Sequence, residues 1–190
     1  MSADTATVLL AALALLVSIV GTIQANRRAL ASERLAVEAR DEARAARTDA
    51  LWSALVESIH GVVSLDPTTE RVKDQWQRLR VTAVALVDGL PDWDGLDRWL
   101  SAEHALGAAI GRQVMEQSKP DDTADQRIAI LKPSIDWAMA LMNNVRLFRA
   151  QGHDAAAMQS LTDNAHDVAR RLYARNGWDL PEPPAWQPLA

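Results

Sequence analysis

The chain has 190 residues, and its 20 Lys and Arg against 25 Asp and Glu give a formal charge of −5. This acidic balance argues against a nucleic-acid binder, which needs basic residues to neutralise phosphates. The absence of cysteine excludes disulfides, thiolate nucleophiles and cysteine-ligated metals. With 48% hydrophobic residues and only eight Gly and eight Pro, the chain has enough apolar material for a packed core.

The N-terminal part, residues 1–26, is predicted to be a transmembrane anchor. No charged residue lies between Asp4 and Arg27. As a helix, residues 5–26 span about 33 Å, which matches a hydrocarbon core of about 30 Å. A cleaved signal peptide is the main alternative, because residues 23–25 resemble a weak cleavage site, but no basic residue precedes the apolar run. We therefore expect residues 5–26 to bind the lipid bilayer as a retained single span.

The charges that flank this span predict its orientation. Arg27, Arg28 and Arg34 follow it, whereas no Lys or Arg precedes it. Basic flanks stay on the cytoplasmic side of a membrane. We therefore expect a single-pass protein of the cell membrane whose C-terminal domain is cytoplasmic.

Residues 27–50 are predicted to form a charged helical stalk that continues the membrane helix. The stalk contains no Gly or Pro and is rich in Ala, Arg, Glu and Leu, which favour helices. Leu30 and Val37 lie one heptad apart, but the next heptad position is Arg44, so the coiled-coil pattern is not sustained. A solvated helix and a helix that self-associates both remain open.

Residues 51–177 are predicted to form a bundle of four or five antiparallel helices, because apolar residues recur at intervals of three and four and no segment alternates with period two. The first helix is expected to end near Leu65, the second to run from Asp66-Pro67 to Gly89, the third from Asp92 or Asp94 to Lys119-Pro120, the fourth from Asp121 or Asp122 to Gln151-Gly152, and the fifth from His153 or Asp154 to Asn176-Gly177. Pro133 either kinks the fourth helix or marks its true beginning.

The predicted inward stripes are Trp52, Leu55, Ile59 and Val62; Val72, Trp76, Leu79, Ala83, Leu86, Val87 and Leu90; Leu96, Trp99, Leu100, Ile110 and Val114; Ile128, Leu131, Ile135, Ala138, Met142 and Val145; and Met158, Leu161, Ala165, Val168 and Leu172. The fold class is therefore all-α.

Residues 178–190 are predicted to form an extended tail, because four Pro in this short segment forbid a helix. One interpretation is that Trp178, with Trp186, packs on the bundle. The other is that the tail binds a partner, since Pro181 and Pro184 have the PxxP spacing. The candidate tail contacts are thus Trp178, Pro181, Pro184 and Trp186.

No motif predicts catalysis, a cofactor or a metal. Phosphate-binding glycine loops and the GxSxG elbow are absent from the sequence. The pattern [DE]xxH, which supplies ligands in di-iron bundles, occurs at Glu57/His60 and Asp163/His166. Both acids fall opposite the apolar stripe of their helix, so we expect solvated residues and no metal site.

Glu103 is the candidate polar site, because it lies within the apolar stripe of the third helix. A buried carboxylate is costly unless it is paired. It forms a structural ion pair, extends toward solvent at the end of the bundle, or lines a pocket or an interface. Glu103, Arg146 and Arg149 form the candidate polar core or interface site. The full set of candidate partners is Arg80, Arg146, Arg149 and His60.

Three further residues of the third helix near Glu103 carry predictions of their own, namely Gly107, Gly111 and His104. Gly107 and Gly111 form a GxxxG pattern, which in a soluble helix predicts close approach of another helix. His104 is expected to be exposed at the edge of the stripe.

The favoured function is a non-enzymatic, membrane-tethered interaction or scaffold module with a protein partner. The alternatives are a homo-oligomerising structural subunit of a membrane complex and a membrane-bound enzyme or ligand sensor with a pocket near Glu103. The order of span, arginine pair, stalk and small helical domain resembles that of bacterial membrane-anchored proteins, a resemblance of architecture alone.

Overall fold

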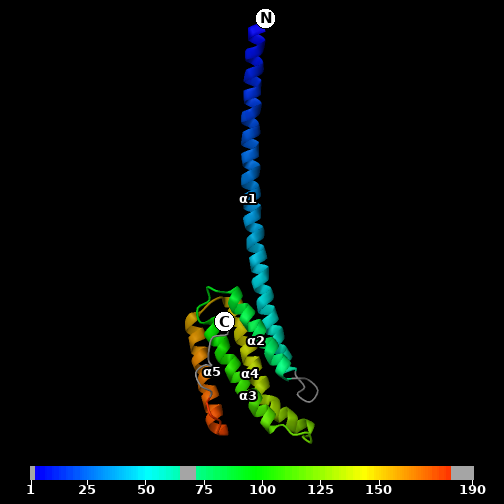
Figure 1. Cartoon of the computed structure of the whole chain (residues 1–190), viewed down its shortest axis with the longest axis vertical. Helices are drawn as coiled ribbons and strands as arrows, with labels where there is room; N and C mark the ends of the chain where they lie inside the picture. The colour runs from blue at the N-terminus through cyan, green and yellow to red at the C-terminus, as the bar shows by residue number, and fades with distance from the viewer. Residues whose placement is uncertain (1–2, 65–71, 181–190) are drawn as a thin grey trace. The chain divides into compact units, whose positions relative to one another are not determined.

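The computed structural model describes the backbone of residues 3–64 and 72–180, and the side chains at positions 24, 26, 28–64 and 74–180. These residues form five α-helices and no strand, so the predicted all-α class is confirmed. The helices, labelled in Figure 1, are α1 (Ala3–Val63), α2 (Val72–Gly89), α3 (Leu96–Gln117), α4 (Ala124–Gln151) and α5 (Ala155–Asn176).

The chain divides into two compact units, Met1–Arg47 and Thr48–Ala190. The described part of the first unit is helical and belongs to α1. This is expected because the chain has neither glycine nor proline between Gly21 and Gly61. The predicted span, residues 5–26, lies outside the described side chains except at Gln24 and Asn26. Among the side chains that are described, no helix is long and apolar enough to cross a membrane.

The second unit is a bundle whose successive helices run in opposite directions, with α3 packed against α2, α4 and α5 (Figure 1). Its core draws side chains from all five helices. The largest side chains that are almost completely buried are Trp99, Leu55, Ile59, Leu86, Leu96, Met158 and Val145. The predicted helical bundle is thereby confirmed.

The helix ends follow local signals that the sequence contains. Gly152 and Gly177 follow α4 and α5, both with positive φ, as predicted for glycine stops. Asp154 caps α5 by accepting a hydrogen bond from the backbone N–H of Ala157. α1 ends at Val63, close to the predicted Leu65, and the start signal Asp66-Pro67 lies outside the described residues.

Two helix starts differ from the prediction. α3 begins at Leu96 after Gly95, whose φ of 89° only glycine adopts readily, so neither Asp92 nor Asp94 is the cap. α4 begins at Ala124, because Thr123 and Gln126 form a capping box. Neither Asp121 nor Asp122 is therefore the cap of α4.

The predicted core is largely confirmed, and α4 shows where it fails. Every described stripe residue is buried or packs on the core except Ile128, which is 63% exposed, and Ile135, which is half-buried. Pro133 lies inside α4 and does not mark its beginning. The buried residues of α4 all lie beyond Pro133, and the stripe missed three of them, namely Trp137, Leu141 and Phe148.

Candidate functional site

Glu103 lies buried in the middle of α3, with 7% of its surface exposed, and both of its carboxylate oxygens accept hydrogen bonds from tryptophan. The indole N–H of Trp99, one turn earlier on α3, donates to Oε1 at 3.2 Å. The indole N–H of Trp137 on α4 donates to Oε2 at 2.9 Å. The carboxylate therefore joins α3 to α4 through two indole donors.

The ion pair is one of the interpretations that the sequence leaves open for Glu103, and the hydrogen-bond partners that the structure describes are indole N–H groups and not cations. Arg149 instead donates from Nε to Oδ1 of Asp49 at 2.9 Å, which links α4 to α1. Arg146 is exposed, as are the other two candidate partners, Arg80 and His60. The sequence held one signal of the true arrangement, because Trp99 and Glu103 are four residues apart and so share a helix face.

Burial sets the electrostatics of this region. Desolvation raises the pKa of Glu103 above that of an ordinary carboxyl, and the hydrogen bonds from Trp137 and Trp99 offset part of this shift. Burial lowers the pKa of the neighbouring His104, and the positive charge of Arg80 lowers it further. His104 is half-buried, with its ring edge-on to Trp76 at 6.1 Å, so the expectation that it is exposed is wrong.

Two tryptophans from different helices pack on the glycines of α3. Trp76 of α2 stacks on Trp137 with ring centroids 5.3 Å apart and planes inclined by 26°. A Cβ atom on Gly107 would lie 2.5 Å from the Trp137 ring and 2.6 Å from the Trp76 ring, and one on Gly111 would lie 3.4 Å from Trp76. The GxxxG pattern thus accommodates indole rings, which corrects the expectation that it brings two helix backbones together.

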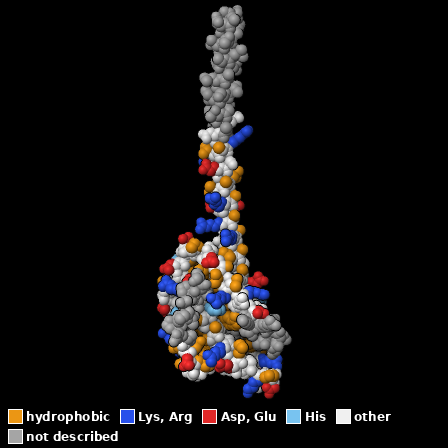
Figure 2. All heavy atoms as spheres, in the orientation of Figure 1, with side chains coloured by type: hydrophobic (Ala, Val, Ile, Leu, Met, Phe, Trp, Pro, Cys, Tyr) orange, Lys and Arg blue, Asp and Glu red, His pale blue; other side chains and the backbone are white. Residues whose placement is uncertain are grey.

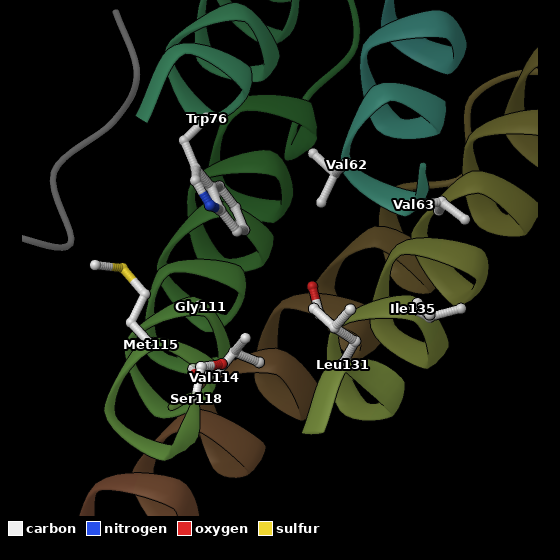
Figure 3. A pocket seen from close by; sticks show the side chains of 10 residues that line it. Val62, Val63, Trp76, Gly111, Val114, Met115, Ser118, Leu131 and Ile135 are labelled. Carbon is white, nitrogen blue, oxygen red and sulfur yellow. Dashed lines mark hydrogen bonds between the residues drawn. The ribbon is translucent and has the colours of Figure 1, made fainter. Parts of the chain in front are cut away.

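Next to this pair of rings lies an apolar cavity of about 240 Å³. Figure 3 shows Trp76, Val62, Leu131 and Met115 surrounding it. Met115 is 65% exposed, so a large apolar side chain of the lining also reaches solvent. The lining residues are Val62 and Val63 from α1, Trp76 from α2, Gly111, Val114 and Met115 from α3 with Ser118 at its end, and Leu131, Ser134 and Ile135 from α4.

The lining of this cavity is chemically suited to binding an apolar group. Its described lining residues include no ionisable side chain, and their polar side-chain groups are the hydroxyls of Ser118 and Ser134 and the indole N–H of Trp76. The Ser118 hydroxyl donates to the carbonyl of Val114 at 2.7 Å. Sequence periodicity predicts inward faces for five of the ten lining residues, namely Val62, Trp76, Val114, Leu131 and Ile135. A void between helices depends on how the helices are placed relative to one another, and periodicity within one helix carries no information on that placement.

The two [DE]xxH pairs do not come together. Glu57, His60 and Asp163 are exposed and His166 is half-buried. Asp163 accepts a hydrogen bond from the side-chain amide of Gln159. Among the side chains that the structure describes, no group of three or more His, Asp or Glu could hold a metal ion.

Of the candidate tail residues, Trp178 is described and contacts the bundle. Its indole N–H donates to Oε2 of Glu116 at 3.2 Å, and the guanidinium of Arg112 lies 4.2 Å from its ring centroid. This is the packing that the first interpretation of the tail predicted for Trp178. The other candidates, Pro181, Pro184 and Trp186, lie outside the described residues.

Trp76 connects the two features of this site, because it lines the cavity and also stacks on Trp137, a hydrogen-bond donor to Glu103. A group that enters the cavity would therefore contact a ring that touches the Glu103 network.

Comparison with known proteins finds no family model, no curated protein and no solved structure that matches this chain.

Proposed function

We propose that this chain is a membrane-tethered interaction module that binds an apolar side chain of a partner protein in the cavity next to Trp76. The cavity is the observation that carries this proposal. Protein interiors are close-packed and contain few voids larger than a water molecule. An apolar-lined cavity of about 240 Å³ with an exposed methionine in its lining is therefore a candidate binding site.

The size and energy of the site suit a single anchoring side chain. Ligand pockets for drug-sized molecules usually exceed about 300 Å³. A large apolar side chain buries about 150–250 Å², which at ~25 cal/mol per Å² corresponds to roughly 4–6 kcal/mol before the costs of association. This gain supports a weak, specific contact.

Attachment to a membrane through residues 5–26 would allow a weak contact to hold the partner protein. The uncharged residues 5–26 are long enough to span a bilayer, and the arginines at 27, 28 and 34 favour a cytoplasmic location for the second unit. Confinement to a membrane raises the effective concentration toward partners that are held there. Figure 2 shows acidic and basic side chains interspersed over the visible face of the second unit.

The cavity is tested by filling it. Ser134 lines the cavity on α4, whereas Ser160 is exposed on α5. We expect Ser134→Phe to abolish the recovery of a protein that the tagged full-length chain captures from native membranes, and Ser160→Phe to leave that recovery unchanged. The near-ultraviolet circular dichroism of both variants establishes that they are folded. Equal recovery by both variants refutes the proposal.

The tether has a separate test. Deletion of residues 5–26 is expected to release the chain from membranes, and the full-length chain is expected to resist extraction with alkaline carbonate. If the deleted chain stays in the membrane fraction, residues 5–26 are not the anchor.

A homo-oligomeric subunit is the second candidate function, and exposed apolar residues in the stalk favour it. Leu30, Leu35 and Val37 are each more than half exposed in the single chain. Leu30 and Val37 lie one heptad apart, as in a short coiled-coil seam. Light scattering of the chain in detergent distinguishes this candidate, because a monomer excludes self-association.

A further inference from the structure

We infer that the apolar group this cavity accepts is an indole ring, the side chain of a tryptophan in the partner protein. This inference rests on the proposed function and deepens it, because it names the side chain that enters. Three properties of the lining support it, namely the volume it encloses, its aromatic wall and the hydrogen bond that Ser118 already makes.

The volume of the cavity matches a bicyclic aromatic ring better than a smaller apolar side chain. An apolar cavity of about 150 Å³ binds benzene, which has six ring atoms. In the same proportion, the nine ring atoms of indole need about 225 Å³, and the phenol of tyrosine needs about 175 Å³. The cavity measures about 240 Å³. A phenyl, phenol or aliphatic side chain would therefore leave part of the cavity empty and lose contacts with its lining.

Trp76 gives the cavity a fixed aromatic wall. Its half-buried ring stacks on Trp137 with centroids 5.3 Å apart, and Trp137 in turn donates to Glu103. These contacts order the Trp76 ring before a partner binds, so binding does not have to supply that ordering. Figure 3 shows the side chains of Trp76 and Met115 beside the cavity. An aromatic ring that enters gains an offset or edge contact with Trp76 and a contact with the Met115 sulfur, and an aliphatic side chain provides neither.

Ser118 selects a hydrogen-bond donor as the polar group of the incoming ring. Its hydroxyl donates its one proton to the carbonyl of Val114 at 2.7 Å, so the lone pairs that remain on Oγ can only accept. Ser118 both lines the cavity and is exposed, so this acceptor lies where the cavity meets solvent. The indole N–H is a donor on the edge of an otherwise apolar ring, so the ring can fill the cavity while its N–H reaches Oγ.

Methionine methyl NMR on the full-length chain tests this inference with free indole as the probe. The chain carries carbon-13 in its methionine methyl groups and is reconstituted in lipid nanodiscs, and Met115→Leu assigns the Met115 signal among the five methionines. We expect indole to shift the Met115 signal in a saturable way, because the ring current of a bound indole acts on a methyl group of the lining. The signal of Met158, which is buried on α5 and does not line the cavity, should stay in place.

Indene is the matched control probe, because it has the shape of indole and lacks the N–H. Ser118→Ala removes the acceptor, and we expect it to weaken the binding of indole by roughly 2- to 10-fold and to leave the binding of indene unchanged. Each probe partitions into the same lipid with either protein, so the ratio of its affinities for the two proteins is free of that effect. Ser134→Phe should abolish both shifts by filling the cavity, and Ser160→Phe should leave both in place.

The outcomes separate this inference from the proposed function. The inference is overturned if indole leaves the Met115 signal in place, or if Ser118→Ala weakens indole no more than indene. If Ser134→Phe abolishes capture of the membrane partner in that case, the proposed function stands with a different side chain in the cavity. If indole binds as expected while Ser134→Phe leaves capture unchanged, the cavity still takes an indole, and it is the proposed function that is wrong.

Discussion

The same substitution at two glycines of α3, one turn apart, should have opposite effects on stability. Gly→Ala inside a helix normally stabilises it by roughly 0.5–1 kcal/mol, because alanine loses less backbone entropy on folding. A Cβ atom on Gly111 would lie 3.4–3.5 Å from Trp76, which is ordinary contact. We therefore expect Gly111→Ala to raise the free energy of unfolding by roughly 0.5–1 kcal/mol.

Gly107→Ala should instead lower the free energy of unfolding. The new Cβ would lie 2.5 Å from Trp137 and 2.6 Å from Trp76, whereas carbon atoms pack best at about 3.5–4.0 Å. Neither ring moves freely, because Trp137 is hydrogen-bonded to Glu103 and stacked on Trp76. Overpacking of this kind costs about 1–3 kcal/mol, so the net effect after the helix gain is a loss of up to roughly 2.5 kcal/mol.

Urea unfolding of the two full-length variants, followed by tryptophan fluorescence, measures this difference. Fluorescence reports on the second unit, which contains all the described tryptophans. Thermal midpoints should shift by about 2–4 °C per kcal/mol, upward for Gly111→Ala and downward for Gly107→Ala. If Gly107→Ala stabilises the chain as much as Gly111→Ala does, the two indoles do not pack on Gly107 and the description of this site is wrong.

Three further substitutions test the remaining contacts. Burial raises the pKa of Glu103. The stability that Glu103 contributes is therefore fully present below the ordinary carboxyl pKa and is lost as the pH rises through the raised pKa. Urea midpoints measured against pH should show this fall in the wild type and not in Glu103→Gln. Asp49→Ala removes the exposed pair with Arg149 and should lower the unfolding free energy by only about 0.2–1 kcal/mol in the same urea titration. Trp178→Phe removes the hydrogen bond to Glu116, and we expect a loss of about 0.5–1.5 kcal/mol by thermal unfolding.

The helix boundaries were predictable where one residue type determines the local backbone. Gly152 and Gly177 adopt positive φ after α4 and α5, and Asp154 caps α5, all as single-residue signals predicted. The start of α4 was missed because Thr123 needs its reciprocal partner Gln126, three residues further on. Such a capping box is visible in the sequence only if the pair is sought.

The contacts between helices were not predictable in the same way. Periodicity placed Glu103 on an inward face correctly, but its partner on α4, Trp137, was absent from the predicted stripe. The predicted stripe starts at Ile128, before Pro133, whereas the buried residues of α4 begin at Trp137 and include a second row that the stripe does not contain. A buried carboxylate predicts cationic partners, whereas the indole N–H is a hydrogen-bond donor that carries no charge.

The need for a carboxylate at position 103 follows from the tryptophans more than from the acid itself. Trp99 is fully buried and Trp137 is 7% exposed, and each indole carries one N–H that needs an acceptor. An apolar residue at 103 would leave both donors unsatisfied, at about 1–3 kcal/mol each. Glutamine presents one oxygen and one NH₂ group, so it can accept from one indole while its own donors face the other. A carboxyl group is therefore the side chain whose two oxygens can satisfy both donors, which accounts for an acid that burial alone disfavours.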